Sequence, residues 1–213
     1  MRSIQSIIIY TGGSGGDFLK SICCQQCDSD FGFNLSDRGM INFNQHYFKD
    51  LSEQCYIHNK PMPDLDLSQI TPVDNSHFYL PSYHRFTDCL FFIDYPDQLA
   101  TNIVEIYRKK RYADCNATLL SNHRHMIPDA ILSRACPDNI VKILSVLWIR
   151  QLTALRNNSA LAPVQLADFF DRSKMIAVCE TLIGQPISNI ELFDQSLNNW
   201  VNNNTQLAQL FGN

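Results

Sequence analysis

The start of the chain joins an apolar run, a group of glycines and an amphipathic pattern. Residues 4–10 read Ile-Gln-Ser-Ile-Ile-Ile-Tyr, a β-branched and aromatic run typical of a buried strand in a parallel sheet. Beyond the glycines, apolar residues recur at helical spacing from Phe18 to Cys23, and Asp17 stands where a helix dipole favours a carboxylate. The pattern predicts a strand, a glycine-rich loop and a helix in direct succession.

Further along the chain, apolar runs and helical periods alternate. Residues 77–81 and 89–94 predict two strands, and Pro96 opens a helix that ends in the basic residues 108–111. No clear pattern covers residues 28–71. The second half is mostly helical, with expected helices around residues 140–148, 175–183 and 193–201 and a short strand at 164–166. This order predicts an α/β fold with an open, mainly parallel sheet flanked by helices.

Composition narrows the class of protein. With 213 residues, 45% of them hydrophobic and 18% charged, the chain can form one core, so a single domain over residues 1–213 is expected. The net charge of -4 argues against a general nucleic-acid binder. The absence of a membrane-span or signal-peptide pattern predicts a cytoplasmic protein, although export without a signal stays open. The eight cysteines have no regular spacing and are expected to be free thiols.

The glycine loop is the main candidate for chemistry. Gly12, Gly13, Gly15 and Gly16 are four of the eight glycines in the chain. Such a loop lets backbone N–H groups converge on an anion, the helix that follows adds its dipole, and Ser14 offers a hydroxyl. A bound phosphate is therefore predicted, with a tight connection that holds no ligand as the alternative. The loop matches neither the Walker A spacing nor the dinucleotide-binding spacing of glycines.

Residues 7–19 resemble the 5′-phosphosulfate loop of the sulfotransferase family. The matching positions are Ser14, Gly15, Phe18 and Leu19. Gly13 stands where that family has a basic residue, and Gly16 and Asp17 stand for its two threonines.

Three later segments extend the resemblance. Residues 76–81 are similar to the segment with the catalytic histidine of sulfotransferases, and residues 90–102 are similar to their 3′-phosphate-binding strand, Pro and helix. In the latter segment, Asp94 and Asn102 replace the family's arginine and serine. Residues 166–204 look like the closing part of such enzymes, without their late Arg-Lys-Gly loop.

The resemblance implies a P-loop-like three-layer sandwich and transfer of a sulfuryl group from 3′-phosphoadenosine 5′-phosphosulfate to a hydroxyl or amine. His77 is then the candidate base, with His84 in reserve. Backbone N–H groups of the loop would hold the 5′ side of the nucleotide. The residues implied in nucleotide binding are Gly12, Gly13, Ser14, Gly15, Gly16, Asp17, Phe18, Asn102 and Arg108, with Lys109 as an alternative to Arg108.

Two other functions stay open. The missing basic residue at position 13 and the presence of Asp94 would suit a non-catalytic protein that uses the same fold to bind a protein partner. A small-molecule kinase is the third possibility, because Asp94 at the end of a strand could hold magnesium, but the loop lacks the expected lysine.

No resident metal is predicted. A group of thiols and one imidazole could in principle bind zinc, but their spacing matches no known zinc pattern. His123 and His125 are expected in a surface loop. The zinc candidates are Cys23, Cys24, Cys27, Cys55 and His58.

Overall fold

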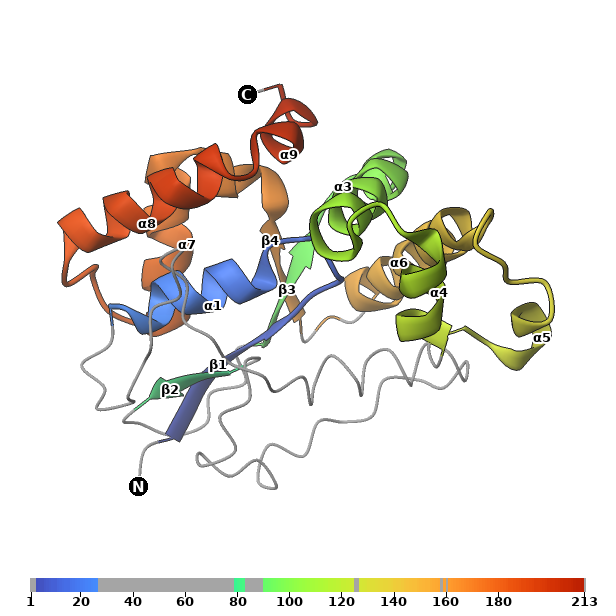
Figure 1. The fold of residues 1–213 in the computed structure, drawn as a ribbon. Coiled ribbons are helices and arrows are strands. Elements are labelled where there is room, and N and C mark those ends of the chain that lie inside the picture. Colours follow the sequence, from blue (N-terminus) through green and yellow to red (C-terminus); the bar gives the residue numbers. More distant parts are fainter. Residues whose placement is uncertain are drawn as a thin grey trace.

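The computed structural model describes residues 3–26, 79–82, 90–124, 127–157, 159 and 161–212. This part of the chain is mostly helical and contains one small β-sheet (Figure 1). No helix within it is long and apolar enough to cross a membrane. The predictions for His77, His84, Cys27, Cys55, His58 and His125 lie outside the described residues.

The sheet has four strands in the order β2-β1-β3-β4. Strands β1 (Ser3–Ile9), β3 (Leu90–Asp94) and β4 (Leu161–Gln165) run parallel, while β2 (Tyr79–Ser82) pairs antiparallel with β1 at the edge. Phe91, Phe92 and Ile93 follow one another in β3, so their side chains point alternately to the two faces of the sheet. All three are buried. The continuous apolar run of β3 therefore reflects a central strand covered on both faces.

One group of helices packs around α1, which contacts α7 and α8, and α7 also contacts β1 and β2. Asp171 caps α7 by accepting hydrogen bonds from the backbone N–H groups of Ser173 and Lys174. Gly184 ends the same helix as its C-cap, with φ 70°, a left-handed conformation that glycine adopts readily. The elements of this group are α1 (Gly16–Cys24), the 3-10 helix η5 (Leu166–Phe170), α7 (Arg172–Ile183), α8 (Ile190–Asn202) and α9 (Thr205–Gln209).

A second group packs around α6, which contacts α3, α4 and β4. In Figure 1 the two groups lie on either side of β3 and β4. The helix predicted at residues 140–148 continues to Arg156, because its buried positions keep the helical period to Leu155. The elements of this group are the 3-10 helix η3 (Asp97–Leu99), α3 (Ala100–Tyr112), α4 (Asn116–His123), α5 (Asp129–Leu132) and α6 (Ile140–Arg156).

These elements agree with the predicted α/β class in its coarse form. Parallel strands, helices on the strands and one cluster of buried side chains are present. The sheet is smaller than expected, since β1, β3 and β4 are the parallel strands among the described residues. The extensive sheet of a three-layer sandwich is not seen in this part of the chain.

Candidate functional site

The glycine loop connects β1 to α1 at the carboxyl ends of the parallel strands (Figure 1). Gly13 and Gly15 have φ angles of 84° and 79°, a left-handed conformation that side chains other than hydrogen disfavour. Gly15 is the N-cap of α1, and no described side chain caps that end of the helix. The first helical hydrogen bond runs from the Leu19 N–H to the Gly15 carbonyl (2.9 Å), so the N–H groups just before it have no intrahelical acceptor. This helix end presents donors and a positive dipole.

The first two glycines also leave room for residues of α3 and α6. A Cβ at position 12 would lie 3.1 Å from Cζ2 of Trp148 and 3.2 Å from Cζ of Tyr107. A Cβ at position 13 would lie 2.9 Å from the Cβ of Tyr107. The lack of a side chain at Gly12 and Gly13 thus lets α3 and α6 pack directly on the loop backbone.

The last two glycines lie against aromatic rings. A Cβ at position 15 would lie 3.1 Å from ring atoms of both Phe169 and Trp200, and one at position 16 would lie 2.1 Å from Cγ of Tyr10. Close packing therefore gives each of Gly12, Gly13, Gly15 and Gly16 a reason to be glycine. The glycine cluster on its own therefore does not identify an anion site. The start of α1, which no described side chain caps, is the better argument for one.

Ser14 takes part in the turn of the loop. Its side chain is fully buried, and its hydroxyl donates to the Thr11 carbonyl at 2.7 Å. The Ser14 N–H also points to that carbonyl, at 3.3 Å. The donors of Ser14 are therefore used inside the loop, and a ligand would meet the backbone N–H groups that follow.

Asp17 and Phe18 face different surroundings. Asp17 is exposed and accepts a hydrogen bond from the Tyr10 hydroxyl at 2.5 Å, which joins the two ends of the loop. Phe18 is buried and stacks on Trp200, with ring centroids 4.5 Å apart and an interplanar angle of 12°. Phe18 thus packs in the core and presents no free ring face to a ligand.

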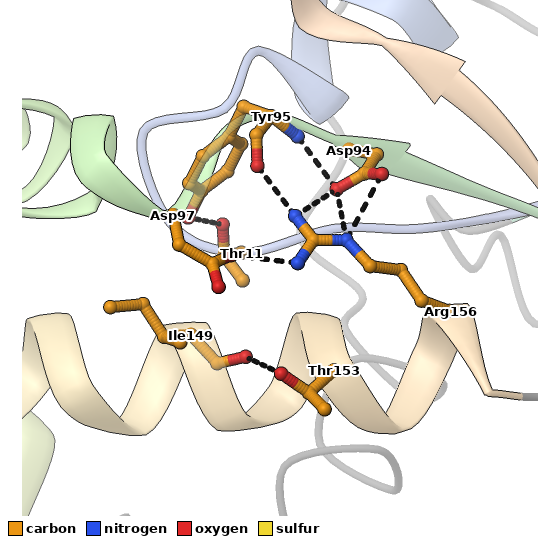
Figure 2. A network of polar contacts seen from close by, with 7 residues as sticks. All are labelled: Thr11, Asp94, Tyr95, Asp97, Ile149, Thr153 and Arg156. Carbon is orange, nitrogen blue, oxygen red and sulfur yellow. Dashed lines mark hydrogen bonds and ion pairs between the residues drawn. The ribbon is translucent and has the colours of Figure 1, made fainter.

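A charged cluster occupies the carboxyl end of the neighbouring strand β3 (Figure 2). The guanidinium of Arg156 donates to the Asp94 carboxylate through Nε (2.9 Å) and Nη2 (2.7 Å), and to Asp97 through Nη1 (2.7 Å). It also donates to the Tyr95 carbonyl at 2.7 Å. Hydrogen bonds to Asp94, opposed in part by burial, raise the pKa of Arg156 above its usual range. Asp94 is therefore neutralised by a residue that the sequence analysis missed.

A buried hydrogen bond links the two strand ends. The Thr11 hydroxyl, after β1, lies 2.8 Å from the Tyr95 hydroxyl, after β3. Burial raises the pKa of Tyr95 above its usual range, more than the Thr11 hydrogen bond lowers it. Tyr95 is thus a neutral hydrogen-bonding group in the core.

The predicted ligands on α3 lie apart from the loop contacts of that helix. Asn102 is exposed in the first turn of α3. Arg108 donates to Glu105 at 2.8 Å through Nε and forms an ion pair with Asp114, and the hydrogen bond to Glu105 is the main cause that raises the pKa of Arg108. The guanidinium is held by two carboxylates, whereas Ile103 and Tyr107 are the α3 residues that touch Gly13.

The prediction of a surface position was wrong for His123. This residue ends α4, is 6% exposed and contacts the rings of Tyr107 and Tyr112. Its Nδ1 lies 3.0 Å from the Leu119 carbonyl, so Nδ1 carries the proton and Nε2 faces the Tyr107 hydroxyl at 3.5 Å. The sequence pattern contains little sign of this burial, because Leu119 is the other buried residue of α4 and the two residues do not make a clear apolar face.

The thiols agree with the sequence prediction where they are described. Cys23, Cys115, Cys136 and Cys179 are free. Cys23 is buried on α1, as its apolar position predicts. Within the described ranges, no three metal-ligating side chains come together.

The resemblance to sulfotransferases rests on residues whose placement is now known in part. Residues 7–19 form β1, the loop and the start of α1, and residues 90–102 form β3, η3 and the start of α3. Both segments meet at the carboxyl edge of the parallel strands, through Thr11 and Tyr95. The chain matches no protein-family model, no curated protein and no solved structure, so this resemblance stays a hypothesis.

Proposed function

We propose that the protein binds the phosphate-bearing end of a nucleotide at the N-terminus of α1. The observation that carries the proposal is the uncapped start of this helix, directly after β1 and its left-handed glycines. Helix N-termini favour phosphate because their N–H groups and dipole point at the anion. Open α/β sheets bind their ligands at this edge, beyond the carboxyl ends of the strands.

The resemblance over residues 7–19 and 90–102 favours 3′-phosphoadenosine 5′-phosphosulfate as the nucleotide. The proposed activity is transfer of its sulfuryl group to a hydroxyl or amine, on the three-layer fold of a divergent sulfotransferase. A base removes the proton of the acceptor, and backbone donors stabilise charge on the departing phosphate. His77 is the proposed base and His84 the second candidate.

Isothermal titration calorimetry with 3′-phosphoadenosine 5′-phosphate tests the binding step. This ligand is the expected product and cannot transfer a sulfuryl group, so its heat reports binding alone. We expect a dissociation constant in the micromolar range, which corresponds to about -8 kcal/mol. Absence of measurable binding at low salt would refute the nucleotide proposal, whatever acceptor the protein uses.

A non-catalytic interaction protein on the same scaffold is the second candidate. It is favoured by the side chains that pack against all four loop glycines and give them a structural role. It is also favoured by the pairing of Arg156 with Asp94 and Asp97, because two carboxylates already hold the basic group at the place of the family's 3′-phosphate arginine. The same pairing weakens the kinase alternative, because a magnesium ion at Asp94 would have to compete with the guanidinium.

A further inference from the structure

We propose that the indole N–H of Trp148 donates a hydrogen bond to the anion held by the glycine loop. The inference rests on the proposed function and deepens it, because it names a side chain of α6 as a donor of the phosphate site. The resemblance to sulfotransferases implied no residue of α6 in nucleotide binding. This contact is therefore specific to the present chain.

Trp148 contains a buried donor without an acceptor. Its side chain is 1% exposed, and its Nε1 has no hydrogen-bond partner among the described residues. A buried indole N–H in a folded protein usually has a partner. Because this N–H is already removed from water in the free protein, an acceptor that reaches it gains a hydrogen bond without a further cost for desolvating the donor.

The indole of Trp148 lies directly against the glycine loop. A Cβ at Gly12 would be 3.1 Å from Cζ2 of Trp148 and 3.2 Å from its Cη2. Nε1 is bonded to the ring carbon next to Cζ2, so the unpaired donor adjoins the part of the indole that meets the loop backbone. The Tyr107 ring, with its Cζ 3.2 Å from the same Cβ position, packs edge-on against the indole. The donor of Trp148 is therefore held beside the loop.

The loop backbone offers further donors on its path into α1. The Ser14 N–H points to the Thr11 carbonyl at 3.3 Å and closes a tight turn. Within the described part of the chain, no acceptor is found for the N–H groups of Gly13, Gly15 and Gly16. Gly13 and Gly15 are partly exposed, so solvent reaches this side of the loop. Backbone donors and an indole donor thus lie along one short segment, and each can donate to an anion oxygen.

Contact with Trp148 requires a small movement at position 12. Gly12 is buried and packs closely on the indole, so a ligand oxygen reaches Nε1 only when the loop backbone and the ring shift against each other. Glycine allows such a shift because no side chain restricts its backbone angles. The surroundings of the Trp148 indole therefore change when the anion binds.

Nuclear magnetic resonance of the full chain, isotope-labelled at its tryptophan indole nitrogens, tests this contact. The chain has two tryptophans, so two indole N–H signals are expected, and Trp148→Phe and Trp200→Phe assign them. The protein is titrated with 3′-phosphoadenosine 5′-phosphate and, separately, with inorganic sulfate at low salt. We expect the Trp148 indole proton to move to lower field as its hydrogen bond forms, and the Trp200 signal to move less.

Calorimetry on the same variants measures what the N–H contributes to binding. Trp148→Phe keeps an aromatic ring and removes the N–H, so we expect nucleotide binding to weaken about fivefold, the loss of one hydrogen bond. Trp200→Phe is the matched control, because Trp200 packs on the loop at Gly15 and its Nε1 is not among the buried unpaired atoms of the described residues. It should change binding less than twofold. Thermal unfolding checks that each variant is folded.

The possible results separate the two proposals. A Trp148 signal that stays in place while the nucleotide binds, or binding that Trp148→Phe leaves unchanged, overturns the role of Trp148 and leaves the proposed function standing. Equal weakening by both phenylalanine variants also overturns it, because ring size is then the cause. No binding of either ligand to wild type overturns both proposals. Sulfate that binds alone and moves the Trp148 signal supports the contact but identifies a free anion as the ligand. If Trp148→Phe does not fold, the wild-type signal, assigned through Trp200→Phe, decides.

Discussion

The neighbouring strands β1 and β3 end in two polar regions of opposite character. At the end of β3, Arg156 lies between Asp94 and Asp97, and each charged group already has its partner (Figure 2). At the end of β1, the glycine loop leads into a helix whose first N–H groups have no intrahelical acceptor. The first region is complete by itself and stabilises the fold. The second contains fewer charges, and no described side chain caps its helix.

The comparison teaches that charge alone is a poor guide to a site. Asp94 is the residue that a sequence reading singles out, either as a magnesium ligand or as a barrier to phosphate. In the structure, Arg156 satisfies it. A helix start that no described side chain caps, and a buried donor such as Trp148 Nε1 without a described partner, are the features that led to the proposed site.

Substitution of Gly15, in the loop after β1, should have the largest effect on stability. In Gly15→Ala the new Cβ meets the rings of Phe169 and Trp200 at 3.1 Å and also adopts a φ of 79°. We expect the free energy of unfolding to fall by about 3 kcal/mol, measured by urea denaturation.

Gly212→Ala is the matched control for Gly15→Ala. Gly212 has a similar φ of 80°, but nothing lies within 4 Å of its Cβ position. It should therefore lose about 1 kcal/mol or less, from the backbone conformation alone. Equal losses in the two variants would show that ring packing is not what requires glycine at position 15.

Removal of Arg156, in the charged cluster at the end of β3, should have the next largest effect on stability. Arg156→Met leaves Asp94 and Asp97 side by side without their cation. Because the Arg156 side chain is 31% exposed and solvent screens the cluster, we expect a loss of about 1–2 kcal/mol in urea denaturation.

The double variant Arg156→Met with Asp94→Asn sharpens that result. It should recover part of the lost stability, because the uncompensated carboxylate at Asp94 is gone. Nucleotide binding should stay within twofold of wild type in the single variant, since the proposed anion site lies at the start of α1. A large loss of binding would show that the two strand ends form one site.

Substitution of Asp17, at the start of α1, should have the smallest effect on stability. Asp17→Asn removes an exposed negative charge from the first turn of α1. Stability should fall by about 0.3–1 kcal/mol through the helix dipole, while binding of 3′-phosphoadenosine 5′-phosphate should tighten roughly threefold. Calorimetry and urea denaturation measure the two opposite changes. Weaker or unchanged binding would contradict an anion at this helix end.

Local sequence patterns predicted the central elements well. The strand, loop and helix at the start of the chain, the apolar run of β3 and the long helix α6 all follow from hydrophobic period and from glycine positions. Helix α4 was not predicted because Leu119 and His123 are its buried residues and give no clear apolar face. The position of α4 becomes clear only in the structure, where it packs against α3 and α6.

The site was predictable only in part. The pairing of Arg156 with Asp94 joins residues 62 positions apart, and no spacing rule connects them. The rings that fill the space at Gly12 and Gly15 come from distant elements too.

The aromatic packing of the loop has a practical consequence. The chain has two tryptophans, and both lie against the loop, Trp148 at Gly12 and Trp200 at Gly15. Their fluorescence therefore originates from the two ends of the candidate site, with no label and no other indole in the background. A change in emission during a titration or an unfolding experiment reports on this loop, so the protein carries its own optical probe of the region that most needs testing.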